Sequence, residues 1–149
     1  MRFISSRSVF GILLLFIAAL AGCQGSTSGI QIEQAWGRAA PESAASGAFY
    51  MKIKNTGSQD DTLITASSPG CGVIEIHEVT MEGDVMSMHP VAGGHLEIPA
   101  GETVELKTGG YHLMCIDKKE EFTAGVRIPL TLQFEQAGEI DLEVEIRNP

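Results

Sequence analysis

Residues 109–115, GGYHLMC, place three candidate metal-binding side chains within four residues, namely His112, Met114 and Cys115. If this segment is a β-strand, residues i and i+2 project to the same face. His112 and Met114 would then offer an imidazole and a thioether to one point, and Cys115 would project to the other face. Such a pair can supply half of a soft metal site. The alternative is that Met114 fills the core and His112 lies at its rim.

A second group of soft side chains lies upstream, in a predicted β-hairpin. Met86 and Met88 form another i, i+2 pair, and they follow a turn signal at residues 82–84 (EGD). This turn is expected to fold them back towards the strand that carries His77, so that His77 can face one of them across the hairpin. Alternatively, the methionines fill gaps in the core and His77 faces solvent.

The ligand types favour Cu(I) over other metals. Thioethers are soft ligands that select Cu(I), and imidazole also binds it well. A set of His and Met without a carboxylate is a poor site for zinc, calcium or magnesium. Because both ligand types are neutral, bound Cu(I) would leave one positive charge, whereas Cu(II) would leave two and prefers nitrogen and oxygen ligands.

The elements that must position these residues are predicted to be β-strands. Apolar and polar residues alternate with period two in the runs 49–53, 74–77, 130–134 and 140–146. Turn signals rich in Gly, Pro and Asp separate the runs, and no window shows a sustained helical period. The sequence therefore predicts a single all-β domain, built as a sandwich or a small barrel.

Residues 1–22 are predicted to be a lipoprotein signal peptide, because two arginines precede an apolar run that ends in the sequence LAGC. The apolar run at residues 9–20 is too short to span a bilayer. Cys23 would become the lipidated N-terminus, and residues 23–29 would form a flexible linker. The alternatives are an ordinary signal peptide that contains a Cys, or an uncleaved anchor.

The chain is acidic, with a formal net charge of −9 that becomes −11 once the signal peptide and its two arginines are removed. A chain with this charge binds nucleic acid and anionic lipid poorly. The sequence has no nucleophile–base signature, HExxH motif or Gly-rich phosphate loop, so an enzyme is not expected. These properties suit a domain tethered by its lipid outside the cytoplasmic membrane, in the periplasm or at the cell surface.

Taken together, the residues resemble the motif of the PCuAC family of periplasmic copper chaperones. That motif is a His, ten residues, a Met, about twenty-one residues and then His-x-Met. Here ten residues separate His77 from Met88, and residues 112–114 (HLM) supply the last part. Twenty-three residues separate Met88 from this HxM, and the two extra residues fit the turn at residues 92–94.

The resemblance covers nearly all of residues 30–149. It implies a cupredoxin-like Greek-key β-sandwich for this domain, with Cu(I) bound on exposed loops and strand ends at one end of the sandwich. The implied role is to carry Cu(I) outside the cytoplasm. Proteins of this family often deliver it towards the CuA centre of cytochrome oxidase, alongside Sco-type proteins.

The resemblance also implies a ligand set for this chain. The implied Cu(I) ligands are His77, Met88, His112 and Met114. Met86 and Met81 are interpreted as residues beside these ligands or at the entrance to the site. His89 and His95 are interpreted as solvated turn residues.

Two cysteines, Cys71 and Cys115, remain once Cys23 carries lipid. In an oxidising compartment the preferred interpretation is a disulfide between them, with two free thiols or a thiolate metal ligand as alternatives. Strand alternation turns Cys115 away from the HxM side chains, which argues against ligation. The same alternation puts Cys71 on the opposite face from Cys115, so a disulfide needs a break in register, for which Gly70 and Gly72 are candidates.

Three hypotheses for the function follow, and the preferred one is a Cu(I) chaperone. A blue-copper electron carrier needs a Cys, two His and a weak axial Met, usually with the Cys before the last His and Met. Cys115 follows His112 and Met114 instead. The third hypothesis is a metal-free lipoprotein module that binds another protein, with Met and His as core residues.

Overall fold

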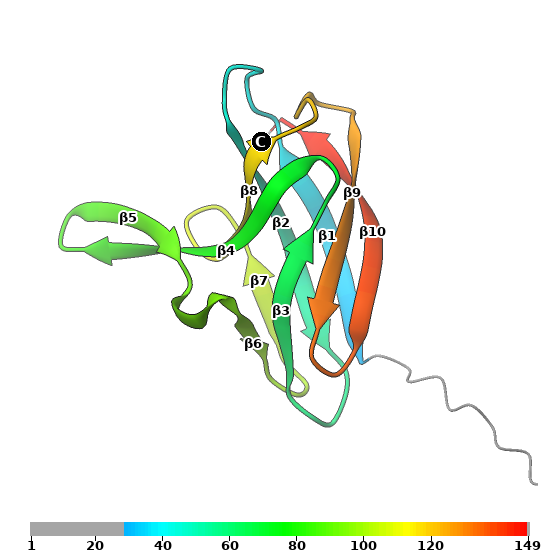
Figure 1. Cartoon of the computed structure of the whole chain (residues 1–149). Helices are drawn as coiled ribbons and strands as arrows, with labels where there is room; N and C mark the ends of the chain where they lie inside the picture. The colour runs from blue at the N-terminus through cyan, green and yellow to red at the C-terminus, as the bar shows by residue number, and fades with distance from the viewer. Residues whose placement is uncertain (1–28, 149) are drawn as a thin grey trace, which may run out of the picture.

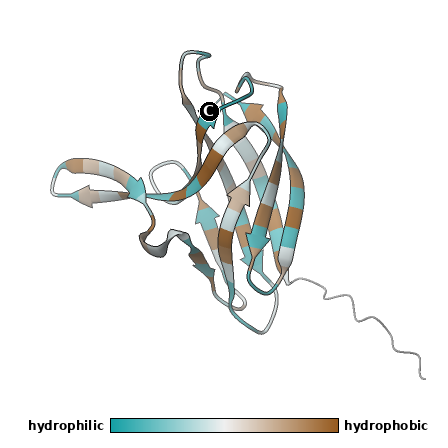
Figure 2. Cartoon of the chain, in the orientation of Figure 1, coloured by the Kyte–Doolittle hydropathy of each residue, from teal (hydrophilic) through white to brown (hydrophobic). Residues whose placement is uncertain are grey.

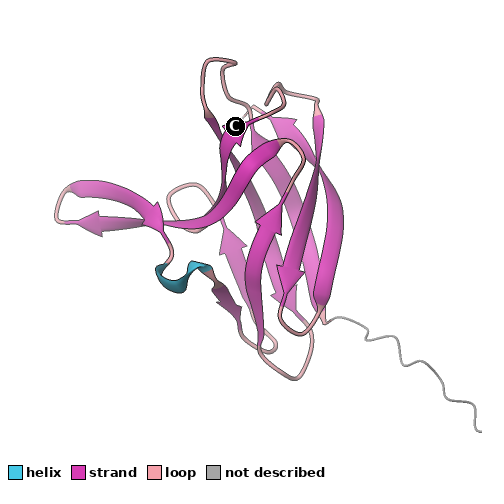
Figure 3. Cartoon of the chain, viewed as in Figure 1, coloured by secondary structure: helices cyan, strands magenta, loops and turns pink. Residues whose placement is uncertain are grey.

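Residues 29–148 are described by the structure, a computed structural model, and almost all of their regular structure is β-strand (Figure 3). The elements in chain order are β1 (Ile30–Arg38), β2 (Ser46–Asn55), β3 (Asp61–Ser67), β4 (Cys71–Glu82), β5 (Val85–Pro90), the 3-10 turn η1 (Ala92–Gly94), β6 (Leu96–Ile98), β7 (Thr103–Leu106), β8 (His112–Lys118), β9 (Arg127–Phe134) and β10 (Gly138–Arg147). The predicted strands all form.

The strands pair in the order β5-β4-β8-β2-β1-β10-β9-β3-β6. The sheet folds over on itself around one core, which makes a β-sandwich (Figure 1). β1 and β10 run parallel, and the other pairings in this order are antiparallel. β2 divides its second edge between β8 and β7. The expectation of a single all-β sandwich domain is confirmed.

Alternation along the strands builds the core. In β9, Leu130, Leu132 and Phe134 are almost fully buried, while the residues that alternate with them, Pro129, Thr131 and Gln133, are exposed or partly exposed. In β10, Val144 and Ile146 are fully buried, and the acidic residues between the apolar ones face outwards. Burial of apolar side chains on one face of each strand fixes the register, because a slip of one residue would turn the whole set to solvent.

The β4–β5 hairpin extends beyond the body of the sandwich (Figure 1). A two-residue turn of Gly83 and Asp84 joins the strands, with Glu82 opposite Val85. Gly83 has a φ of 65°, which a glycine adopts without the steric cost other residues would meet. Hydrophobic positions continue along the hairpin into solvent (Figure 2). β5 ends the strand order and pairs with β4.

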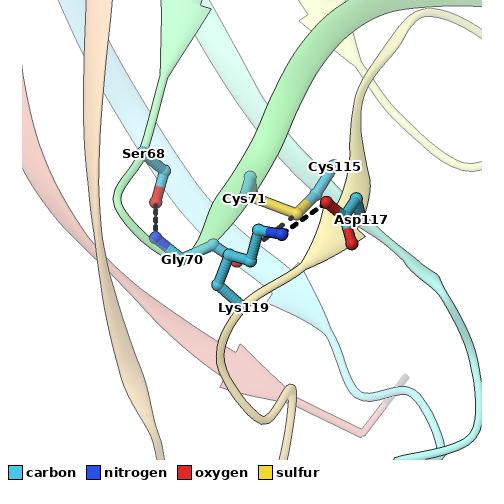
Figure 4. The surroundings of a disulfide bond; sticks show 6 residues. All are labelled: Ser68, Gly70, Cys71, Cys115, Asp117 and Lys119. Carbon is cyan, nitrogen blue, oxygen red and sulfur yellow. Dashed lines mark hydrogen bonds and ion pairs between the residues drawn. A yellow bond between two sulfur atoms is a disulfide. The ribbon is translucent and has the colours of Figure 1, made fainter.

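A disulfide joins Cys71 at the start of β4 to Cys115 in β8, with Cα atoms 5.5 Å apart (Figure 4). Cys71 and Ile74 both face the core although they are three positions apart, so alternation breaks at Gly72 and Val73, which are both exposed. Asp117, opposite this break, has a φ of 56°. A side chain at residue 72 would collide with Asp117, so the flanking glycine permits the break.

The predicted signal peptide, residues 1–22, and the predicted lipidation site Cys23 lie outside the residues that the structure describes. So does the linker up to residue 28. Within the described part of the chain, no helix is long and apolar enough to cross a membrane.

Candidate metal centre

Two histidines face each other on the outer surface of the β4–β8 pair. His77 and His112 are directly opposite across the strands, and their ring centroids are 5.8 Å apart at an interplanar angle of 61°. Their exposed fractions are 8% and 5%. The opposite surface of the same strands is core, where Ile76 and Leu113 lie. Alternation therefore places both imidazoles on one face. The burial of Ile76 and Leu113 on the other face fixes the strands that carry them.

Each imidazole uses one ring nitrogen in a hydrogen bond. Nδ1 of His112 lies 3.1 Å from the backbone oxygen of Gly110 and can donate to it. Nε2 of His77 lies 2.9 Å from Oε2 of Glu75. Nδ1 of His77 is buried and has no hydrogen-bond partner. If the bonded nitrogens carry the protons, Nε2 of His112 and Nδ1 of His77 are left as acceptors, and such acceptors suit a metal ion.

Glu75 is a functional candidate that sequence reasoning missed. Its carboxylate holds the His77 ring through Nε2, and Glu75 is also the cross-strand neighbour of Met114. A carboxylate that binds the outer nitrogen of a metal-binding imidazole fixes its tautomer and raises its basicity. The signal was present as Glu-x-His, because residues 75 and 77 share a face of a strand.

Thioethers border the two imidazoles. Met114 projects beside His112 on the same face of β8 and is partly buried. Met88 lies in β5 opposite Val79, which is two residues after His77 on the same face of β4. Its side chain is 52% exposed. A largely apolar groove of about 580 Å³ runs along the His112 side of this surface, and His77 is not among its lining residues. Its lining includes Tyr50, Val79, Met86, Met88, His112 and Met114.

The structure corrects the expected cross-strand neighbours of His77. The two-residue turn sets a register in which His77 is opposite Pro90, so neither Met86 nor Met88 is directly across from it. Met86 is instead paired with Met81. Both of these methionines are exposed, and Met86 lines the groove.

The expected setting on loops and strand ends is corrected for three of the four candidate ligands. His77, Met88 and Met114 lie within strands, and His112 is the first residue of β8. His89 was expected in a turn but lies in β5, where its imidazole is 3.4 Å from a carboxylate oxygen of Glu78. His95 is exposed in a loop, as expected, with its ring bonded to the backbone oxygen of Gly93.

Burial lowers the pKa of His112 below its ordinary value of 6.5. The hydrogen bond to Gly110 acts in the opposite direction, and the nearby His77 adds to the lowering. Removing an imidazole from water disfavours its charged form. The ring is therefore neutral at neutral pH, which is the form that binds a metal.

Aromatic rings support the face of His112 that is turned from His77. Tyr50 lies 6.2 Å from His112 between ring centroids, and Trp36 lies 4.8 Å from Tyr50. Cys115 is fully buried on the core side and bonded to Cys71, so its sulfur is not offered to this face. Among the described residues, no group of three or more His, Cys, Asp or Glu side chains forms a metal-binding cluster.

Comparison with known families adds to this geometry. The family model described as "Putative lipoprotein LpqE-like" matches residues 30–146. The chain belongs to the LpqE-like family. A relative from Leifsonia xyli subsp. xyli, "Putative lipoprotein Lxx21020", is 30% identical over 120 residues, which cover 80% of this chain and 70% of the relative. An uncharacterized protein of Rickettsia prowazekii, RP573, is 30% identical over 101 residues, covering 68% of this chain and 55% of its own length.

The LpqE-like chain also resembles solved PCuAC domains. The copper-bound PCuAC domain from PmoF2 aligns with a TM-score of 0.68 at 25% identity, covering 81% of this chain and 94% of that domain. Apo-DR1885 from Deinococcus radiodurans aligns with a TM-score of 0.62 at 21% identity, covering 100% of this chain and 97% of its own. These matches confirm both the resemblance to PCuAC domains and the predicted fold, a cupredoxin-like Greek-key β-sandwich.

Proposed function

We propose that this protein is a Cu(I) carrier that works outside the cytoplasm and binds one Cu(I) through His77, Met88, His112 and Met114. The observation that carries the proposal is the pair of facing, buried imidazoles, in which Nδ1 of His77 has no hydrogen-bond partner and His112 bonds to Gly110 through Nδ1, which leaves its Nε2 for a ligand. Two thioethers lie beside this pair, along an open apolar groove. The copper-bound PCuAC domain of the same fold supports the choice of metal.

The chemistry of the set suits transfer of copper rather than its permanent retention. Four neutral ligands leave the single positive charge of Cu(I), and the carboxylate of Glu75 behind His77 partly offsets it. Met88 is 52% exposed, so a ligand from another protein can replace it without unfolding the sandwich. Soft, weakly held thioethers favour such exchange. This role requires no catalytic residue.

The disulfide argues against the blue-copper alternative. A blue-copper site needs a Cys thiolate bound to the metal. Cys115 is the cysteine nearest in sequence to His112, and its sulfur is bonded to Cys71 on the core side of β8. Among the described residues, no thiolate therefore reaches this face, and a copper-loaded protein is expected to lack the intense colour of a Cu(II)–thiolate bond.

The site of action and the recipient form the finer part of the proposal. Removal of residues 1–22 and lipidation of Cys23 would tether the domain to a membrane surface, and the lipoprotein name of a relative supports this anchoring. The recipient we propose is the CuA centre of cytochrome oxidase, with Sco-type proteins as partners. This recipient follows from the resemblance to PCuAC chaperones alone.

Titration of the purified protein with Cu(I), in competition with a chromogenic Cu(I) chelator, tests the proposal. One tightly bound Cu(I) is expected, and X-ray absorption should report both nitrogen and sulfur neighbours. The double variant His112→Ala with Met114→Leu should lose this copper while its circular dichroism stays unchanged. A matched control is His95→Ala, which removes an exposed histidine outside the site and should bind as the parent does.

Two results would contradict the assignment. If the double variant still binds one Cu(I) with the affinity of the parent protein, the metal lies elsewhere. If the parent protein binds no Cu(I) against the chelator, the metal-free interaction module becomes the better description. Transfer to a soluble CuA domain, followed by the optical bands of the CuA centre, tests the recipient separately.

A further inference from the structure

Three methionines are exposed along one face of the β4–β5 hairpin. The exposed fractions are 60% for Met81, 67% for Met86 and 52% for Met88. By contrast, Met51 in β2 is 2% exposed and fills the core. An apolar side chain on a hairpin that extends into solvent gains little from burial in the folded domain. The exposure of all three therefore points to a use outside the core.

The register places these methionines in a row that leads to the two histidines. Met81 is directly opposite Met86, and Met88 is opposite Val79, the next pair inwards on the same face. Because residues i and i+2 and directly opposed residues share a face, all of them lie on the face that carries His77. The acidic residues Glu78 and Glu82 fall on the other face. The row therefore offers thioethers without carboxylates.

Directly opposed residues in an antiparallel pair have Cβ atoms about 4.5–5.5 Å apart. The unbranched Met side chain has three rotatable bonds, so two sulfur atoms starting from that distance can converge on one ion. Met81 and Met86 form such a pair near the tip of the hairpin. Met88 follows Met86 by two residues, about 7 Å further along β5.

We propose that Met81 and Met86 form a second Cu(I) site, at which the ion arrives before it passes to Met88 and then to the centre at His77 and His112. The destination rests on the function proposed above, but the binding of Cu(I) by the Met81–Met86 pair does not. In the first step the Cu–S bonds to Met81 and Met86 break as a Cu–S bond to Met88 forms. In the second step Met88 stays bound while Cu–N bonds to His77 and His112 and a Cu–S bond to Met114 form. The ion keeps its +1 charge, and no electron or proton moves.

The chemistry of thioethers makes this site distinguishable from an apolar docking surface. Leucine preserves the apolar surface and approximate volume of methionine but has no sulfur. A docking surface for another protein would tolerate Met81→Leu with Met86→Leu. A Cu(I) site would not, because only the sulfur atoms bind the metal.

The test is nuclear magnetic resonance of the purified protein labelled with 13C in the methionine methyl groups, titrated with Cu(I) under anaerobic conditions. The first equivalent should shift the methyl signals of Met88 and Met114, and further Cu(I) should shift those of Met81 and Met86. Met51 serves as an internal reference because it is buried in the core. In the variant His112→Ala with Met114→Leu, the signals of Met81 and Met86 should still shift.

The kinetic arm measures uptake of Cu(I) from a coloured chelate by stopped flow. The variant Met81→Leu with Met86→Leu should keep the tightly bound Cu(I) but take it up several-fold more slowly than the parent protein. The control is Val85→Ala, which changes a residue 66% exposed on the opposite face of the same hairpin and should not alter the rate.

Each outcome decides one of the two proposals. Unshifted Met81 and Met86 signals in both the parent protein and the His112–Met114 variant would overturn the second site. Uptake by the leucine variant at the parent rate would overturn its role as the point of arrival. If Met81 and Met86 shift while the first equivalent leaves Met88 and Met114 unmoved, the second site stands and the proposed main centre fails.

Discussion

Oε2 of Glu75 lies 2.9 Å from Nε2 of His77, and the other ring nitrogen of His77, Nδ1, is buried without a partner. The hydrogen bond to Glu75 occupies Nε2 of His77, and Nδ1 is left for a ligand. Because Glu75 and His77 lie two apart on β4, the strand itself supplies the alignment. Carboxylate–imidazole–metal arrangements of this type orient the ligand and raise its basicity.

Replacement of Glu75 by Ala is predicted to lower the affinity for Cu(I) by about 10–100-fold, because loss of such a carboxylate frees the ring and reduces its basicity. Competition with a Cu(I) chelator measures the change. Glu75→Gln keeps an oxygen that can accept the hydrogen bond but removes the charge, so its loss should be smaller. Equal affinities for the parent and Glu75→Ala would show that the carboxylate does not support the site.

The stability of the copper-free protein is predicted to fall as the pH drops below the ordinary pKa of histidine, partly through His112. Burial lowers the pKa of His112 in the folded state, whereas in the unfolded chain it has its ordinary value of 6.5. Its contribution is therefore complete above pH 6.5 and is lost as the pH falls towards and through the folded-state pKa. Urea unfolding between pH 7.5 and pH 5 measures the effect.

The matched comparison for this pH dependence is His112→Asn, which is polar and does not titrate. The difference in unfolding free energy between parent and variant should shrink as the pH falls. Parallel curves for the two proteins would mean that His112 titrates alike in the folded and unfolded states.

Removal of the disulfide is predicted to lower the free energy of unfolding by about 4 kcal/mol on the chain-entropy view, given the 44-residue separation of Cys71 and Cys115. The double variant with Ala at both positions, compared with the parent by urea denaturation, measures the loss. Because both sulfurs lie on the core side, this variant should still bind one Cu(I) when folded. A folded variant that binds no Cu(I) would assign a direct role in the centre to the cysteines.

The packing beneath the site is predicted to reject a methyl group at residue 47. Gly47 lies in β2 opposite Cys115, and a Cβ added there would come within 2.6 Å of Cδ1 of Phe122. Phe122 is buried against Phe49 at 5.3 Å between ring centroids and has little room to move. Gly47→Ala should therefore destabilise the domain by about 1–3 kcal/mol, measured by thermal or urea unfolding.

Gly110→Ala is the control for this packing test. A Cβ at residue 110 would lie 3.4 Å from its nearest neighbour, Cγ of the exposed Lys107, so its effect on unfolding should be small. If Gly47→Ala unfolds like Gly110→Ala, the ring of Phe122 is free to yield.

Alternation in the sequence was sufficient to predict the strands, the sandwich and the shared face of His112 and Met114. It could not place His77, because the cross-strand partner depends on which residues form the turn. The two-residue turn puts Pro90 opposite His77, and a turn longer by one residue would have changed that partner. Glu75 was not predicted, because a carboxylate is not a soft ligand and its contact with the site is a hydrogen bond to His77.

The hydrophobic pattern also failed to predict that Cys71 and Cys115 project to the same face. Alternation alone puts Cys71 and Cys115 on opposite faces, and only the local backbone reveals the break at Gly72. A register break depends on the φ and ψ angles of one or two residues, which the hydrophobic pattern does not encode. The glycines marked the place where the break was possible, but not whether it occurs.

Met88 differs from the other three candidate ligands in the element that carries it. His77, His112 and Met114 lie on strands with neighbours on both sides, whereas β5 pairs with β4 alone among the described strands. Segments with few buried contacts open at a lower free energy than the core that supports them. Local opening of β5 would reduce the coordination number from four to three while the sandwich remains folded. In the proposed centre, affinity for the ion would then reside mainly in the rigid sheet, and its residence time would be governed by the fluctuation of a single edge strand.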